Sequence, residues 1–147
     1  MLPEALEAAY RRTRYRVSIP RGGALDLRIG RRCPALDRWL RARACRQWAF
    51  VTASNPGSRP LPDWRNAARG RGLARAIAAA GFRVLPARGE PEQGGWRAEA
   101  SLLVLGMPAA RAVRLGRQFR QIAIVAGRRG GVAQLCWCGP VPGKPAA

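Results

Sequence analysis

Apolar and polar residues alternate over residues 13–19, which is the pattern of a half-buried β-strand. Arg14 and Arg16 occupy two of the polar positions, so one face of this strand should be wet and rich in arginine. A second strand is expected over residues 25–29, and the Pro-Arg-Gly-Gly segment between them has the composition of a turn. The sequence therefore predicts an N-terminal β-hairpin.

Helical spacing of apolar residues appears in four segments. Pro34 suits the first position of a helix whose apolar stripe extends to Ala44. Asp63 is a suitable N-cap for a longer helix, and Gly81 is a suitable glycine at its end. The expected helices cover residues 1–12, 34–44, 64–80 and 107–119.

The remaining apolar runs are short and β-like, and between two of them we expect a polar loop over residues 87–95. From residue 48 to 126 the predicted order is strand, helix, strand, strand, helix, strand, which is the split βαβ or ferredoxin-like arrangement. We predict an α+β fold with this βαββαβ core, to which the N-terminal hairpin and helix and a C-terminal strand are added. One domain over residues 1–138 and a flexible proline-rich tail over 139–147 are expected. The expected strands cover residues 48–53, 82–86, 96–105, 121–126 and 132–137.

The expected sheet places the first core strand beside the third and parallel to it. The fourth core strand is expected at an edge beside the second, again parallel. In that arrangement the third and fourth strands begin at the edge opposite the end of the first strand. Only an altered order, with those strands antiparallel to the first, would bring their starting residues to the loop that follows residue 51.

Length and composition indicate a globular protein. A chain of 147 residues can bury a core without metal or disulfides, and 48% of its residues are hydrophobic. No uncharged apolar run approaches the roughly 18 residues of a membrane span. The first residues include Glu4 and Glu7 and lack a long apolar stretch, so no signal peptide is expected and a cytoplasmic location is the default.

The net charge of +19 arises from 27 basic and 8 acidic residues, and every basic residue except Lys144 is arginine. Such a balance favours an anionic partner: nucleic acid, an anionic membrane surface or a phosphorylated small molecule. Arginine accumulation in a GC-rich genome would give the same composition without a binding role. Both interpretations stay open.

Histidine is absent, which excludes Ser-His-Asp and Cys-His catalysis and every zinc site that uses histidine. The four cysteines, Cys33, Cys45, Cys136 and Cys138, lack the paired spacing of a zinc knuckle. We expect four free thiols and no metal site. No cofactor is indicated.

Candidate chemistry gathers around the loop that leaves the first core strand. Asn66 and Arg69 fall in the opening turns of the next helix, where free N–H groups favour an anion. Asn66 shares one helix face with Leu73, so it should point inward. Glu99 is the one acidic residue inside a regular core strand. The structural alternative is a capped turn, a satisfied buried amide and a solvated carboxylate paired with arginine.

Four short motifs, Thr52-Ala-Ser-Asn-Pro-Gly-Ser58, Asn66-Ala-Ala-Arg69, Trp96 with Glu99-Ala-Ser101, and Gln121-Ile-Ala, resemble the motif series of a bacterial family known as domain of unknown function 3293. The resemblance covers about residues 10–126 and implies no settled activity. Ala100, where an acidic or polar residue is expected, and Arg120, where glycine is more usual, depart from the pattern. A weaker likeness links these motifs to phage enzymes that cleave S-adenosylmethionine, which resemble a small trimeric ferredoxin-type fold.

The function expected from these residues is binding of a small anionic or zwitterionic, nucleotide-like ligand. Arg69 would hold an anionic group, the amides would orient the ligand, and Glu99 would bind an amine or sulfonium or act as a catalytic general base. One alternative is a nucleic-acid (RNA) binder that uses hairpin and helix arginines with Trp39 or Trp64, and another is a structural partner protein. A homo-oligomer stays open. The expected ligand-binding residues are Thr52, Asn55, Ser58, Asn66, Arg69, Trp96, Ser101 and Gln121.

Overall fold

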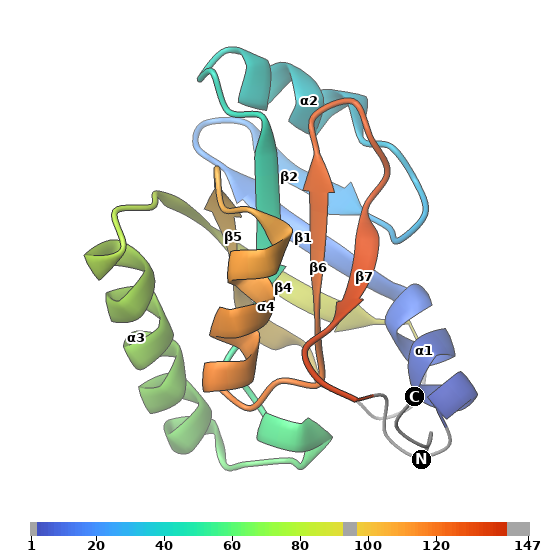
Figure 1. Ribbon diagram of the computed structural model, residues 1–147, viewed down its shortest axis with the longest axis vertical. Helices are drawn as coiled ribbons and strands as arrows, with labels where there is room; N and C mark the ends of the chain where they lie inside the picture. The colour runs from blue at the N-terminus through green and yellow to red at the C-terminus, as the bar shows by residue number, and fades with distance from the viewer. Residues whose placement is uncertain (1–2, 93–96, 141–147) are drawn as a thin grey trace.

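The computed structural model describes residues 3–92 and 97–140. Its helices and strands follow the order expected from the hydrophobic pattern (Figure 1). The helices are α1 (Pro3–Arg11), α2 (Pro34–Arg41), the short 3-10 helix η1 (Pro56–Ser58), α3 (Asp63–Ala79) and α4 (Ala109–Gln118). The strands are β1 (Thr13–Ile19), β2 (Gly23–Leu27), β3 (Gln47–Val51), β4 (Val84–Pro91), β5 (Glu99–Leu105), β6 (Ala123–Arg128) and β7 (Gln134–Trp137).

The strands form one sheet in the order β2-β1-β4-β5-β3-β6-β7, and every neighbouring pair is antiparallel. Helix α3 connects β3 to β4, and β5 lies between these two strands. Helix α4 connects β5 to β6, and β3 lies between them. The two units are interleaved split βαβ motifs. The predicted α+β fold with its βαββαβ core is therefore confirmed.

Two details of the expected sheet are wrong. Strand β3 does lie beside β5, but the two are antiparallel, with Val51 opposite Leu102. Strand β6 pairs with β3 and not with β4. The reason lies in the connections between strands. Helix α3 returns the chain to the edge of the sheet where β3 began, so β4 is parallel to β3. Strand β5 then runs back beside β4 and is antiparallel to it. The end of β3 and the starts of β5 and β6 consequently share one edge of the sheet.

Several expected boundaries also shift. Strand β4 continues to Pro91, through part of the segment expected to be a loop, because it pairs with both β1 and β5. Strand β5 begins at Glu99 and β6 at Ala123, each later than expected. Asp63 is the first residue of α3 and not its cap, a position taken by Pro62. Of the expected tail, residues 141–147 lie outside the described residues.

Both faces of the sheet are buried. Helices α3 and α4 cover one face, where Leu73 and Ile77 of α3 pack with Ala112 of α4. The other face is the inside of the curled sheet, where Leu103 and Leu105 pack against Leu36 and other apolar side chains. Alternate residues of β5 therefore enter two different cores.

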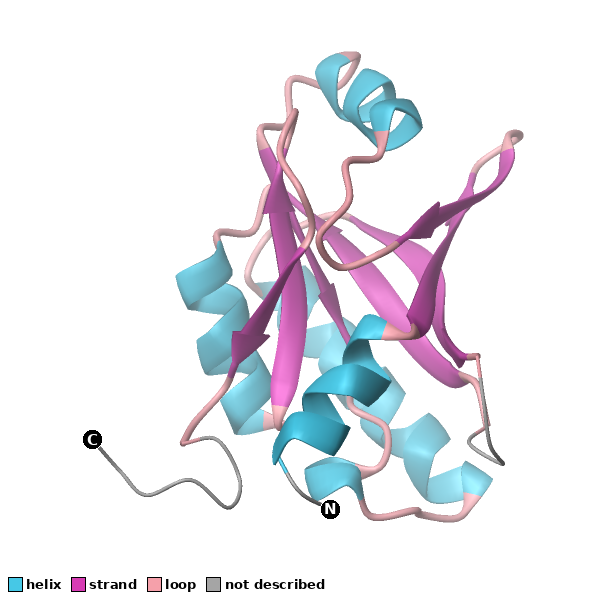
Figure 2. Cartoon of the chain, turned by 90° about the vertical axis from the view of Figure 1, so that its right-hand side faces the viewer, coloured by secondary structure: helices cyan, strands magenta, loops and turns pink. Residues whose placement is uncertain are grey.

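The curl brings the two ends of the sheet together. The backbone after β2 forms a bridge with the backbone before β7, where the Gly30 N–H donates to the Ala133 carbonyl at 2.8 Å. Helix α2 lies at one end of the curl and α1 at the other (Figure 2). In the described part of the chain, no helix has both the length and the apolar character needed to cross a membrane.

Candidate functional site

The loop after β3 is held by a pair of asparagines. Asn55 adopts a left-handed conformation (φ 49°), which asparagine tolerates better than most residues. Its Oδ1 accepts hydrogen bonds from the Leu61 N–H at 2.9 Å and from Asn66 Nδ2 at 2.8 Å. Its backbone N–H donates to Asn66 Oδ1 at 2.9 Å. The inward-pointing Asn66 thus fixes the loop to the first turns of α3.

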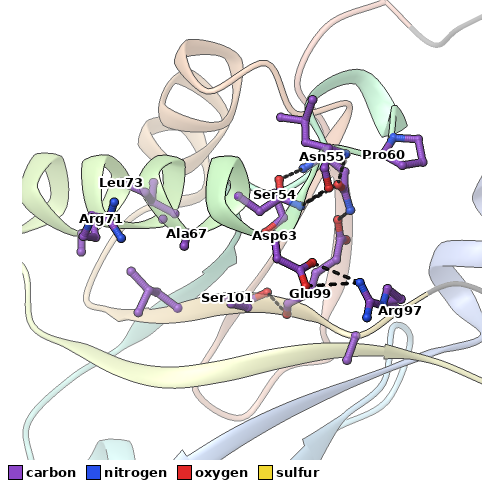
Figure 3. A pocket seen from close by; sticks show the side chains of 17 residues that line it. Ser54, Asn55, Pro60, Asp63, Ala67, Arg71, Leu73, Arg97, Glu99 and Ser101 are labelled. Carbon is purple, nitrogen blue, oxygen red and sulfur yellow. Dashed lines mark hydrogen bonds and ion pairs between the residues drawn. The ribbon is translucent and has the colours of Figure 1, made fainter.

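Glu99 is the charged group of this cluster. Asn55 Nδ2 donates to Glu99 Oε2 at 2.9 Å, as Figure 3 shows. Burial raises the pKa of Glu99, and the hydrogen bond from Asn55 acts in the opposite direction. The structural alternative of a solvated carboxylate paired with arginine does not describe Glu99, because the face of β5 that carries it is the inside of the curl.

An ion pair with arginine is missing at Glu99, although arginine is abundant in the chain. Five other acidic residues form such pairs, including Glu90 with Arg14 at 3.1 Å and Asp26 with Arg16 at 2.9 Å. Within residues 3–92 and 97–140, neither an ion pair nor a protein partner for Oε1 is found at Glu99. This oxygen is available to a ligand.

A small cavity of about 90 Å³ lies inside the curl beside Glu99. Its lining mixes polar and apolar groups, because the fold brings together side chains from the ends of β3, β5 and β6 and from the loop after β3. The expected site residues that line it are Thr52, Asn55, Ser58, Glu99, Ser101 and Gln121.

The cavity also contains residues that the sequence analysis missed: Tyr10, Thr13 and Tyr15. Burial and, to a lesser extent, the negative charge of Glu99 raise the pKa of Tyr10 to about 12, although the hydrogen bond with the Ser58 side chain acts in the opposite direction. The Tyr15 hydroxyl donates to the Tyr10 carbonyl at 2.9 Å. Alternation along β1 could have placed Thr13 and Tyr15 on one face, but nothing in the sequence pairs α1 with the far edge of the core.

Several hydroxyl donors at the cavity are already used within the protein. Thr52 Oγ1 donates to the Ala100 carbonyl at 2.7 Å, and Ser101 Oγ donates to the Glu99 carbonyl at 3.0 Å. These bonds hold the end of β3 against the start of β5. Within the described residues, Glu99 Oε1 has no such hydrogen bond and is left to contact a bound molecule.

A larger groove of about 660 Å³ lies between α3 and β5 and shares Asn55, Glu99 and Ser101 with the small cavity (Figure 3). Its walls combine apolar groups with two exposed arginines, Arg71 and Arg97. A Cβ built at Gly70 would meet no atom within 4 Å, so the absence of a side chain there keeps the groove open. The other lining residues include Leu61, Leu73, Ala67 and Ala74.

Arg69 does not take the expected role of anion anchor. Its Nε donates to the Ala53 carbonyl at 2.6 Å and its Nη2 to the Phe119 carbonyl, and it lines neither cavity. Gln121 Nε2 donates to the Ser54 carbonyl at 3.1 Å. Arg69 and Gln121 therefore tie the loop after β3 to the end of α4. The expected ligand residue Trp96 lies outside the described residues.

Among the described residues, those that line the two cavities include no cysteine. In the described ranges, no group of three or more acidic or cysteine side chains could hold a metal ion. All four cysteines are free. Burial raises the pKa of the Cys138 thiol to about 11, which disfavours the reactive thiolate.

The fold and the site define an α+β protein with interleaved split βαβ units and a partly polar cavity at the edge where they meet. The model of the family described as protein of unknown function (DUF3293) matches residues 51–124, and the chain belongs to this family. The match runs from the end of β3 into β6 and includes the asparagine pair, Glu99 and Gln121. No curated protein and no solved structure matches the chain. The likeness to phage S-adenosylmethionine-cleaving enzymes stays a prediction.

Proposed function

We propose that this protein binds a small zwitterionic molecule of about nucleotide size, with a cationic or hydrogen-bond-donating head at Glu99. The observation that carries the proposal is the partly buried Glu99 carboxylate, which receives one amide hydrogen bond and no ion pair within the described residues. A desolvated carboxylate is costly to the fold unless a partner compensates it. An amine-bearing ligand would supply that partner.

The small cavity and the groove are connected, and their sizes suggest which part of the ligand each would hold. The small cavity suits a head group only, whereas the groove has the volume of ordinary small-molecule sites, about 300–1,000 Å³. The groove is lined by apolar side chains, by Asp63, and by two cations, Arg71 and Arg97, of which Arg97 pairs with Asp63 at 3.2 Å. The body of the ligand would pack on Leu61 and Leu73, with an anionic group near Arg71.

A purely anionic ligand is less favoured, because its charge would have to avoid Glu99 at the inner end of the groove. The same carboxylate has the properties of a general base, since its raised pKa makes it a better proton acceptor than an exposed glutamate. Oε1 would receive the proton. Ligand binding is the primary proposal, and catalysis by Glu99 as a general base would be a further activity of the same site.

The test is a thermal-shift panel on the intact protein. It compares small amines, nucleoside monophosphates and molecules that carry both an amine and a phosphate or carboxylate. We expect the third group to raise the melting temperature most, because it satisfies Glu99 and Arg71 together. Glu99→Gln should abolish the shift.

A matched control is Glu92→Gln, which removes one carboxylate from an exposed position outside both cavities. This variant should keep the full shift. Equal shifts in the wild type and Glu99→Gln, or stabilisation by anions alone, would contradict the proposal.

A further inference from the structure

Acidic residues are absent from three long stretches of the chain, residues 38–62, 64–89 and 100–147. These stretches contain nearly all of α3 and the whole of α4. The arginines of the N-terminal hairpin are different, because Arg14 and Arg16 pair with Glu90 and Asp26, and Arg28 pairs with Glu92. The positive charge of the hairpin is therefore largely compensated, and the uncompensated charge lies elsewhere.

Helices α3 and α4 lie on the same side of the sheet (Figure 1). Their outer surfaces carry exposed arginines. None of their exposed arginines pairs with a carboxylate of the described residues. We call this surface the helix face. Its exposed arginines are Arg65, Arg71 and Arg75 of α3 and Arg111, Arg114 and Arg117 of α4.

The helix face also carries an aromatic side chain. Trp64, in the first turn of α3, is 69% exposed, and the Arg65 guanidinium lies 5.4 Å from its ring centroid. Helical spacing aligns Trp64 with Arg71 and Arg75 along the outer side of α3, with the small Ala68 between them. By contrast, Trp39 is half-buried and covered by Arg43 at 3.6 Å, so it offers no free face to a base.

We propose that the helix face binds single-stranded nucleic acid, with arginines on the phosphates and Trp64 stacked on a base. Arg71 and Arg75 are about one helical turn apart, roughly 6 Å along the axis, so two successive cations face the same side of α3. An exposed indole beside a row of cations is the combination by which proteins bind unpaired strands without sequence preference.

The composition of the helix face argues against two other partners. A membrane surface would require a set of apolar side chains to insert, but alanines fill the positions between the arginines and Trp64 is alone. A second copy of the chain would bring like charges together. A single-stranded nucleic acid can make both kinds of contact: its phosphates pair with the arginines, and its bases stack on Trp64.

The experiment measures fluorescence anisotropy of a labelled RNA strand of about 20 nucleotides, and of its duplex, between about 50 and 200 mM salt. Arg75→Gln with Arg114→Gln removes two charges from the helix face without touching the groove or the small cavity. The matched control, Arg31→Gln with Arg32→Gln, removes two exposed charges between β2 and α2.

We expect the helix-face pair to weaken strand binding about tenfold and to reduce the slope of log K against log salt by about 1.4, since two contacts at roughly 0.7 each are lost. The control pair should change affinity less than about twofold. Trp64→Ala should weaken single-strand binding about five- to tenfold with the salt slope unchanged, and affect the duplex little.

Equal losses from both arginine pairs would show diffuse attraction to a basic protein and would overturn the proposal. Binding to vesicles of anionic phospholipid in place of the strand would overturn it as well. Because Glu99 lies outside the helix face, Glu99→Gln should bind RNA like the wild type, so this test and the small-molecule test fail independently.

Discussion

At Glu99 the chain retains a carboxylate whose charged form is disfavoured by its surroundings. Asn55 donates one hydrogen bond, and no arginine in the described residues reaches it. Functional polar groups are commonly kept at a cost in stability. The free energy of unfolding should therefore depend on whether the Glu99 side chain is ionised or protonated.

Glu99→Gln should stabilise the protein at neutral pH and have little effect in acid. The raised pKa means that the folded protein holds this proton more tightly than the unfolded chain does. As pH rises from about 4 to 7.5, the wild type loses stability that the glutamine variant keeps. Urea unfolding at both pH values measures the difference.

Asp26→Asn is the control for this pH dependence, because the hydrogen bond from Arg16 lowers the pKa of Asp26. Its contribution has the opposite sign and falls in a more acidic range: the wild-type aspartate adds stability as pH rises toward about 4, and above that pH the difference in stability from the asparagine variant stays nearly constant. A Glu99→Gln variant that is less stable than the wild type at neutral pH, and equally so in acid, would contradict the account of Glu99.

Asn66→Ala should lower the free energy of unfolding by about 1–3 kcal/mol, because it leaves the Asn55 N–H without its acceptor. Arg65→Ala, one residue away on the exposed side of α3, should change it by less than about 0.5 kcal/mol. Chemical denaturation of both variants measures the contrast. Similar small effects would mean that the asparagine pair does not hold the loop.

At the scale of elements, the contact between α4 and the sheet depends on Gly116. A Cβ at this position would lie 2.6 Å from Cys138 Sγ and 2.8 Å from Ile124 Cγ2. Helix α4 can approach β6 closely only because glycine has no side chain. At Gly72, in α3, the same Cβ would make an ordinary contact of 3.7 Å with Phe119.

Gly116→Ala should therefore destabilise the protein by about 1–3 kcal/mol through overpacking. Gly72→Ala should stabilise it by about 0.5–1 kcal/mol, because alanine is the better helix residue and space is available. Thermal unfolding of the two variants measures both changes in stability. A Gly116→Ala variant that is as stable as the wild type, or more stable, would show that the α4 contact is less tight than described.

The sequence predicts the elements of this fold better than their partners. Periodicity places the helices and the inward side of Asn66, because those features depend on nearby residues. Pro86 and Gly89 interrupt the strand pattern of β4, yet β4 continues through them because it pairs on both sides with β1 and β5. The role of Arg69 was also hidden, since its acceptors at Ala53 and Phe119 are brought together only by the tertiary fold.

The candidate site follows the same rule. Alternation along β5 puts Glu99 and Ser101 on one face, but whether that face is wet or buried depends on how the whole sheet curls. The curl also brings Tyr10 from α1 to the cavity, and this could not be predicted from spacing. The family resemblance supplied the residues, and the antiparallel sheet supplied their proximity.

For the whole molecule, the dominant feature is its net charge of +19, with most ion pairs formed by the N-terminal hairpin and β4. Raising salt from about 0.05 to 0.5 M should raise the melting temperature, because screening weakens repulsion among the arginines. Arg75→Gln with Arg114→Gln should melt higher at low salt and respond less to added salt. Calorimetry that finds salt destabilising the wild type would contradict this expectation.

The proposed ligand site is tested most directly by native mass spectrometry of the purified protein. The wild type should retain a small molecule that carries both a cationic or donor group and an anionic group. Glu99→Gln should lose it, and the Arg31→Gln with Arg32→Gln variant should keep it. A bound molecule retained equally by Glu99→Gln, or one without a group able to pair with a carboxylate, would contradict the account.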